Sequence, residues 1–211
     1  MMTRNRRRFM RALAGSVAVL VMAASVASAD QIALEQGASA VAETLLEELG
    51  EAMTREMTKG GPTEAIVVCT RLASEVAGRL SREHGWRVTR VGTRVRNPLL
   101  GMPDAWEQRV LVEFTERAAK GKAFTDMTHH EVVTEPAGQY FRFMKPIVVQ
   151  PKCLFCHGSS EQIPVSIRTM LKKEYPFDRA IGYKAGELRG AVSIKQPLDD
   201  AHGELFGGRD R

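Results

Sequence analysis

The sequence predicts an α+β fold built on an antiparallel sheet. Helical patterns come first in the chain and strand patterns follow them. The later strands are interrupted by helices without the regular β-α alternation that is typical of a parallel sheet. The 211 residues of the chain are enough for one domain with its own core. We therefore expect residues 30–211 to form a single α+β domain.

Residues 1–29 have the composition of a cleavable signal peptide. They contain a cluster of arginines, an apolar stretch from Ala12 to Val26, and then Ala27-Ser28-Ala29, which fits a peptidase site. The apolar stretch is short for a membrane span. We therefore expect export to the periplasm, a mature chain that begins at Asp30, and no stable membrane span after cleavage.

The charge of the chain depends on this segment. The whole sequence has 30 basic and 25 acidic residues, and five of the arginines lie in residues 1–29. The mature chain therefore has 25 of each and is formally neutral. The high isoelectric point belongs to the export signal, so it gives no reason to expect a nucleic-acid or anionic lipid partner.

Two helices are expected to pack as a hairpin at the start of the mature chain. Apolar residues recur at helical spacing over residues 31–58, and Gly60-Gly61-Pro62 then breaks the pattern. A second helix follows to about Glu83. Its apolar stripe places Cys69 on the inward face. In an exported protein this unpaired cysteine is a reactive thiol, an intermolecular bridge, a ligand, or simply a small buried hydrophobe.

The remaining elements are strands with helices between them. Trp86–Val91 alternates as a strand does, a turn-rich loop follows, and Asp104 is the expected N-cap of a helix that runs to Lys120. The later predictions are strands at 131–134 and 139–144, an apolar run at 147–149, a helix at 161–174, a last strand at 189–195, and a loosely held tail at 203–211.

Cys153-Leu154-Phe155-Cys156-His157 carries the clearest chemical signal. Cys-x-x-Cys-His is the attachment motif of c-type haem. Its two thiols lie one helical turn apart, as required to bond the two vinyl groups of the porphyrin, and the adjacent imidazole can bind the iron. A redox dithiol lacks its βαβ context here, a zinc site lacks a second ligand pair, and a disulfide leaves the histidine unexplained. We therefore expect one covalently bound haem c.

Short motifs along nearly the whole mature chain resemble those of a known family. They are Cys69 in its helix, residues 94–98, Pro103, Trp106-Glu107, residues 143–147, the haem motif, residues 175–178, residues 180–183 and residues 189–193. With them the chain resembles small exported single-haem cytochromes c of PAS-like fold, long catalogued as a domain of unknown function and also found as sensor modules. The resemblance implies a PAS-like sheet, His157 as the proximal ligand of the haem iron and Cys69 as the distal one.

Three further residues are candidates for contacts with the haem. Met144 is the alternative distal ligand, because methionine is a common partner in electron-carrying cytochromes, although methionine is also a frequent core residue. The two haem propionates need donors of fixed geometry, which favours arginine. Arg94 and Arg96 are the candidates, with the alternative that Arg96 only caps the turn that follows it. The weaker candidates for the distal position are His84, His129, His130 and His202.

These predictions lead to a periplasmic monohaem c-type cytochrome that is not an enzyme. It would transfer electrons at low potential or sense redox state or a ligand, together with a redox or signalling partner protein. The alternative is a haem enzyme of peroxidase type, which needs an open distal position. If Cys69 fills that position, the enzyme alternative is weakened.

Overall fold

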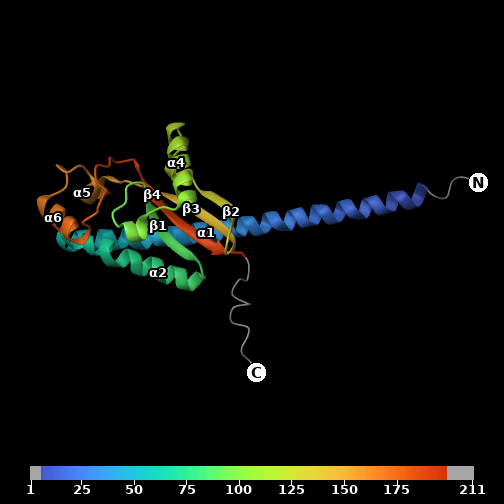
Figure 1. Cartoon of the computed structure of the whole chain (residues 1–211), viewed down its shortest axis with the longest axis horizontal. Coiled ribbons are helices and arrows are strands. Elements are labelled where there is room, and N and C mark those ends of the chain that lie inside the picture. Colours follow the sequence, from blue (N-terminus) through green and yellow to red (C-terminus); the bar gives the residue numbers. More distant parts are fainter. Residues whose placement is uncertain (1–5, 199–211) are drawn as a thin grey trace, which may run out of the picture. The chain divides into compact units, whose positions relative to one another are not determined.

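The computed structural model describes the backbone of residues 6–198 and the side chains of residues 30–198. The predicted loose tail at 203–211 and His202 lie outside the described residues. Contacts divide the chain into one unit that ends at Gly37 and another that starts at Ala38. The described part of the first unit is helical, and the second unit contains the sheet. The predicted α+β fold with an antiparallel sheet is confirmed (Figure 1).

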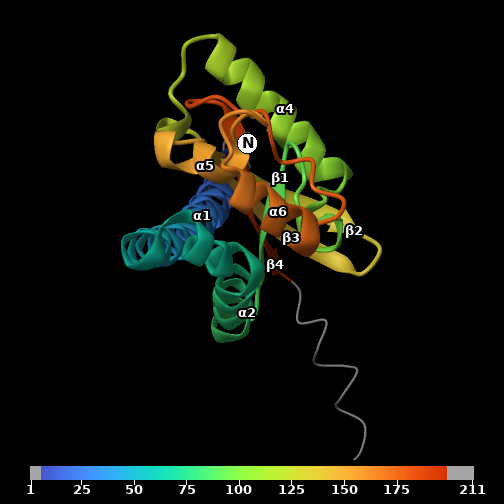
Figure 2. The same cartoon turned by 90° about the vertical axis from the view of Figure 1, so that its left-hand side faces the viewer.

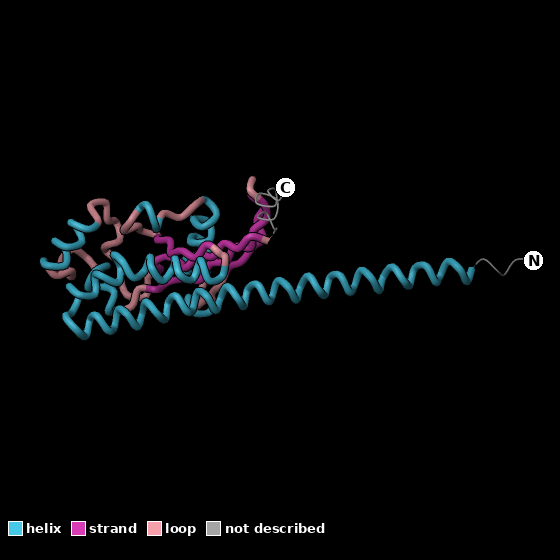
Figure 3. The backbone as a smooth tube through the Cα atoms, turned by 90° about the horizontal axis from the view of Figure 1, so that it is seen from below, coloured by secondary structure: helices cyan, strands magenta, loops and turns pink. Residues whose placement is uncertain are grey.

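The N-terminal helices form the predicted hairpin. Helix α1 (Arg6–Val67) has non-helical backbone angles at Gly60 and Gly61, so the break before Pro62 is confirmed. A π-helix, η1 (Val68–Leu72), leads into α2 (Ala73–His84), which ends at a left-handed Gly85. In Figure 3 the chain turns back at this break, so that α2 runs beside α1. The predicted helix over residues 31–58 is confirmed, and in the uncleaved chain it extends back to Arg6.

The sheet has four antiparallel strands in the order β1-β4-β3-β2. They are β1 (Arg87–Gly92), β2 (His129–Glu135), β3 (Gly138–Val148) and β4 (Leu188–Pro197). The first strand therefore pairs with the last, and β2 and β3 form a hairpin. Strand β3 joins two stretches that the sequence analysis kept apart, because Lys145 and Pro146 stay in register with β4.

Helix α4 (Ala105–Ala119) covers one face of the sheet. It begins with the predicted N-cap, where the Asp104 carboxylate accepts from the Glu107 N–H and the Glu107 carboxylate accepts from the Asp104 N–H. The short helix α3 (Pro98–Gly101) and the 3-10 turn η2 (Phe124–Asp126) flank it. The core on this face consists of Val91, Trp106, Val110, Leu111, Phe114, Met127, Met144, Leu188 and Ala191.

Helix α2 and the part of α1 from Ala38 onward lie on the opposite face of the sheet from α4 (Figure 2). The part of α1 that starts at Ala38 buries a stripe that includes Leu45. An ion pair of 2.8 Å between Glu43 and Lys145 joins α1 to β3. The sheet is therefore covered on both faces, and the site described below lies on the side of α2.

The connection between β3 and β4 carries the haem motif. It consists of η3 (Pro151–Cys153), α5 (Leu154–His157) and α6 (Val165–Glu174). The predicted helix at 161–174 starts four residues late, because Pro164 occupies the N-cap position and the chain before it forms turns. Within the part of the chain that the structure describes, no helix is long and apolar enough to cross a membrane.

Candidate functional site

A cavity of about 600 Å³ brings the predicted site residues together. Its wall contains Cys69 from η1 together with Cys153, Cys156 and His157 from the connection between β3 and β4. Strand β1 and the start of α2 form further parts of the wall. The volume lies within the range of pockets that hold a small molecule or cofactor. Residues far apart in the sequence thus face one cavity.

The motif forms a single tight helical turn. Cys153 ends η3 and precedes α5, which places Cys156 one turn further along. Gly158 then ends the helix, and a Cβ at this position would lie 2.7 Å from the Leu154 carbonyl oxygen and 2.8 Å from the Gln162 side chain. All three cysteines described by the structure are free thiols. Burial, followed by the effect of the nearby Cys69, raises the pKa of Cys156 to about 11, so this thiol is protonated at neutral pH.

His157 is oriented by the loop that precedes β4. Its Nδ1 lies 2.7 Å from the carbonyl oxygen of Ala180. Because a carbonyl only accepts, the proton of the imidazole resides on Nδ1 and the lone pair of Nε2 is available. Protein atoms surround the ring, and this burial, followed by the charges of Arg96 and Arg189, lowers the pKa of His157 well below its usual value. The imidazole is therefore neutral, as a metal ligand must be.

Arg96 fixes the motif to the same loop. It is 7% exposed, and its Nη2 donates to the Cys156 carbonyl at 2.5 Å while its Nε donates to Asp178 at 2.9 Å. Asp178 also accepts from the N–H of Ala180, whose carbonyl holds His157. The third nitrogen, Nη1, is buried without a partner. Arg96 is therefore more than a turn cap, and Asp178 is a site residue that the sequence analysis missed.

The structure does not bring Arg94 into the cavity. Its guanidinium donates to Glu187 at 2.9 Å and to the Gly182 carbonyl at 3.0 Å, and it lies 3.5 Å from the centre of the Tyr183 ring. Arg94 does not belong to the cavity wall. Its interactions are with the loop before β4, so the prediction that it contacts the haem propionates has no support in this geometry.

The cysteine in η1 is better placed than the alternative distal ligands. A π-helix accommodates one extra residue per turn, and such segments occur frequently at functional sites. Cys69 lies in this segment and faces the cavity. Met144 is fully buried in the core under α4 instead. The described histidines of the weaker set have other neighbours, with His84 against Trp86, His129 against Glu113 and Trp106, and His130 against Phe141.

Sequence reasoning missed several other residues of the cavity wall. They are Met53, Met57, Arg90, Tyr175 and Arg189. A signal for Arg90 was present, because it lies two residues after the buried Val88 and therefore on the same face of β1. Nothing in the local pattern marked Met53 or Met57 as different from core methionines.

The fold and the site define an α+β domain with a cavity whose wall carries a Cys-x-x-Cys-His motif and a third cysteine. The chain belongs to the Tll0287-like family, whose model matches residues 14–197. The crystal structure of the cyanobacterial heme-protein Tll0287 is similar, with 26% sequence identity and a TM-score of 0.57. The match covers 74% of this chain and 92% of that chain. No curated protein matches the chain significantly.

Proposed function

We propose that this protein is an exported monohaem c-type cytochrome that transfers electrons at low potential or senses redox state or a ligand. The observation that carries the proposal is the cavity wall itself, which combines both thiols of the motif, an imidazole with a free Nε2, and a separate cysteine. The similar solved protein is described as a heme-protein, which supports the same cofactor here.

The motif residues provide the tether and one ligand. Cys153 and Cys156 would form the thioether bonds to the porphyrin, since they lie one helical turn apart. His157 would bind the iron through Nε2, because Nδ1 is engaged by Ala180. Haem supplies a reversible one-electron couple, while the protein supplies ligation, burial and local charge. The residues present fit the group.

Cys69 is the proposed distal ligand, and it sets the expected potential. A thiolate is a strong donor that stabilises ferric over ferrous iron, so the potential is low compared with that of a methionine-ligated cytochrome. If His157 and Cys69 both bound the iron, no position would be left for a substrate, which favours a carrier or sensor over a catalyst. The peroxidase-type alternative requires an open distal position, which Cys69 would fill.

Two further features belong to the proposal. Residues 1–29 direct export, and the mature protein acts in the periplasm with a redox or signalling partner. The sheet is of PAS-like type, which is supported by four antiparallel strands in which the first pairs with the last. A PAS-like sheet occurs in sensors as well as in carriers, so the fold does not decide between the two roles.

Spectroscopy of the purified oxidised protein tests the proposed ligation and role. We expect a low-spin ferric spectrum of thiolate type, by optical absorption and EPR, and little reaction of the reduced protein with carbon monoxide if it is a carrier. Rapid binding of carbon monoxide after reduction would indicate a sensor in which Cys69 dissociates. A high-spin ferric spectrum with peroxidase activity would instead support the enzyme alternative and contradict the proposal.

A further inference from the structure

The cavity wall carries more positive than negative charge. Its cationic residues are Lys152, Arg90, Arg96 and Arg189, and its one acidic residue is the exposed Glu174. The carboxylate of Asp178 lies nearby but is already bound to Arg96. A buried cation is costly unless an anion or a set of acceptors compensates it. The protein alone therefore leaves a deficit of negative charge at this cavity.

Arg90 shows the deficit most clearly. It has no hydrogen bond or ion pair with any residue that the structure describes, although it lies on the face of β1 that contains the buried Val88. Desolvation by the surrounding protein lowers the pKa of its guanidinium. An exposed surface arginine without a partner would be ordinary, but an arginine that is largely surrounded by protein and faces a cavity needs a reason.

The other two arginines of the cavity wall, Arg96 and Arg189, are only partly satisfied by groups of the protein. Arg96 uses two of its nitrogens to hold the motif and leaves Nη1 buried without a partner. Arg189 donates to the backbone carbonyl of Arg94 at 3.0 Å and lies over the Tyr183 ring, so it has acceptors but no carboxylate. Burial lowers the pKa of Arg189, and the charges of Arg96 and Arg90 lower it further, which places all three within electrostatic reach of one another.

We propose that Arg90 and the free Nη1 of Arg96 bind the two propionate carboxylates of the haem. The inference rests on the proposed function and assigns the anionic edge of the cofactor to the wall formed by β1 and the residues that follow it. A guanidinium offers paired donors in a plane, which match a carboxylate better than the ammonium of a lysine does. Arg90 thus takes the role that the sequence analysis gave to Arg94.

The assignment explains why these nitrogens have no protein partner. A carboxylate would balance the charge of Arg90, since the charge of Arg96 is already paired with Asp178, and it would reduce the repulsion on Arg189. The second carboxylate would supply the acceptor that Arg96 Nη1 lacks. Arg94 needs no such partner, because Glu187 already neutralises it.

The test uses the haem-loaded protein with the variants Arg90→Gln, Arg96→Gln and Arg90→Lys. Arg87→Gln is the matched control, since Arg87 lies on the same strand but is exposed and outside the cavity. The side chain of Arg90 has no hydrogen bond or ion pair with a described residue, so we expect Arg90→Gln to fold and to test the assignment even if Arg96→Gln does not fold. The primary measurement is the set of propionate bending bands in the resonance Raman spectrum.

We expect these bands to shift in Arg90→Gln and Arg96→Gln, to return partly in Arg90→Lys, and to stay unchanged in Arg87→Gln. Loss of a positive charge beside the haem should also move the ferric-to-ferrous ratio about tenfold toward the ferric form at a given potential. This shift should grow as the pH rises and the uncompensated carboxylate ionises. A structural role alone would not move the propionate bands.

Two results would overturn the assignment, and they are distinguishable. If the wild type carries covalent haem but the bands and the potential of Arg90→Gln equal those of Arg87→Gln, the propionates bind elsewhere and only this inference fails. If the wild type carries no haem after maturation in a periplasm, the proposed function fails and the inference fails with it.

Discussion

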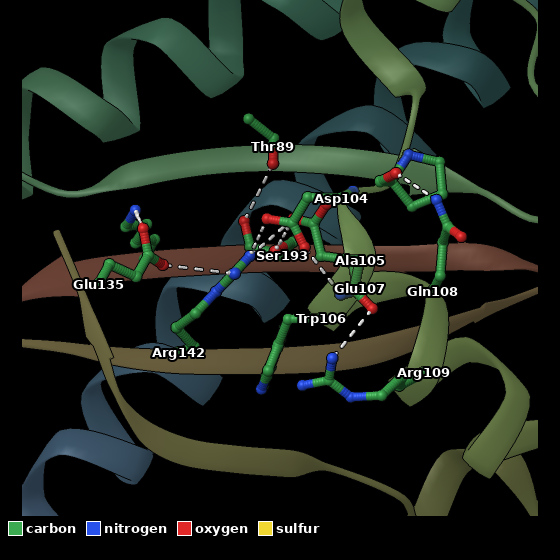
Figure 4. A network of polar contacts seen from close by, with 12 residues as sticks. Thr89, Asp104, Ala105, Trp106, Glu107, Gln108, Arg109, Glu135, Arg142 and Ser193 are labelled. Atoms are coloured by element: carbon green, nitrogen blue, oxygen red, sulfur yellow. Dashed lines mark hydrogen bonds and ion pairs between the residues drawn. The ribbon is translucent and has the colours of Figure 1, made fainter.

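The two faces of the sheet bury arginines in opposite ways. Under α4, Arg142 is 3% exposed and reaches the carboxylates of Asp104 at 2.7 Å, Glu107 at 3.3 Å and Glu135 at 3.6 Å (Figure 4). The Ser193 hydroxyl donates to Glu107 at 2.6 Å and completes the network. On the cavity side, Arg90 has no such partner in the part of the chain that is described.

Arg142 is paired with carboxylates of the protein itself. Arg90 has no such partner among the described residues, and we propose that it pairs with a carboxylate of the cofactor. The Arg142 network is closed by the protein except at its Nε, which has no partner. Its carboxylates come from β2, α4 and the residue that caps α4, so it holds helix to sheet. The cavity arginines are left open on the side where the cofactor is proposed to bind. Burial alone would not distinguish Arg142 from Arg90, whereas the carboxylate partners of Arg142 and their absence around Arg90 among the described residues do.

The largest effect is expected from breaking the closed network. Arg142→Met should lower the free energy of unfolding by about 3–5 kcal/mol, because it leaves the buried carboxylate of Glu107 without its cation. Denaturant unfolding of the purified protein measures the loss, with Arg87→Met as the exposed control. A loss of less than about 1 kcal/mol would mean that Glu107 finds another partner or takes up a proton, and that the two faces differ less than described.

The second comparison is between two sulfur atoms, Cys69 at the cavity and Met144 under α4. Cys69→Ala should abolish the thiolate-type ferric spectrum and raise the potential by more than about 59 mV, a tenfold change for one electron. Met144→Leu is the matched control, since it keeps the volume of the core and should change neither property. EPR and redox titration measure both. The opposite pattern would return Cys69 to the role of a core residue and make Met144 the distal ligand.

The smallest effect on stability is expected for Asp104, the most exposed carboxylate that contacts Arg142. Burial tends to raise the pKa of Asp104, but hydrogen bonds from the Glu107 N–H and from Arg142 outweigh it, so the pKa is lowered. A carboxylate with a lowered folded-state pKa adds stability above its usual pKa near 4, and the contribution is lost as the pH falls through the folded-state value. Asp104→Asn keeps an N-cap but removes the charge.

We therefore expect Asp104→Asn to cost no more than about 1 kcal/mol at neutral pH, because Asp104 is 44% exposed and solvent screens its pair with Arg142. The difference from the wild type should vanish in acid. Unfolding free energies measured across the acid range provide the check. A difference that persists unchanged at low pH would assign the effect to altered capping and not to charge.

The sequence predicted the parts of the molecule that depend on local pattern. Gly60, Gly61 and Pro62 break the helix as expected, since two residues without a helical preference precede one that cannot donate. Asp104 caps α4 because an acceptor side chain followed three residues later by Glu107 is a local arrangement. The helix break and the N-cap can be predicted from the sequence because each depends only on residues that are close together in the chain.

The choice between Arg90 and Arg94 as the cavity arginine was not predicted, because it depends on contacts between segments that are distant in the chain. Arg90 and Arg94 lie four residues apart with similar neighbours, but β1 ends at Gly92 between them and the chain then turns away from the sheet. Gly190, opposite this end, has φ +155, and a Cβ there would collide with the Val91 carbonyl. Which of the two arginines faces the cavity is therefore decided by strand pairing with β4, which local sequence does not encode.

Covalent attachment of haem through Cys153 and Cys156 is the property on which the proposed function depends most. Intact mass measured under denaturing conditions, on protein matured in a periplasm that contains the haem attachment machinery, tests it directly. We expect a chain that begins at Asp30 and is heavier than its polypeptide by one haem, and we expect a smaller fraction of chains with this added mass, or none, in Cys153→Ser and Cys156→Ser. A wild-type mass equal to that of the polypeptide alone, with any haem removed by acid-acetone extraction, would contradict this attachment.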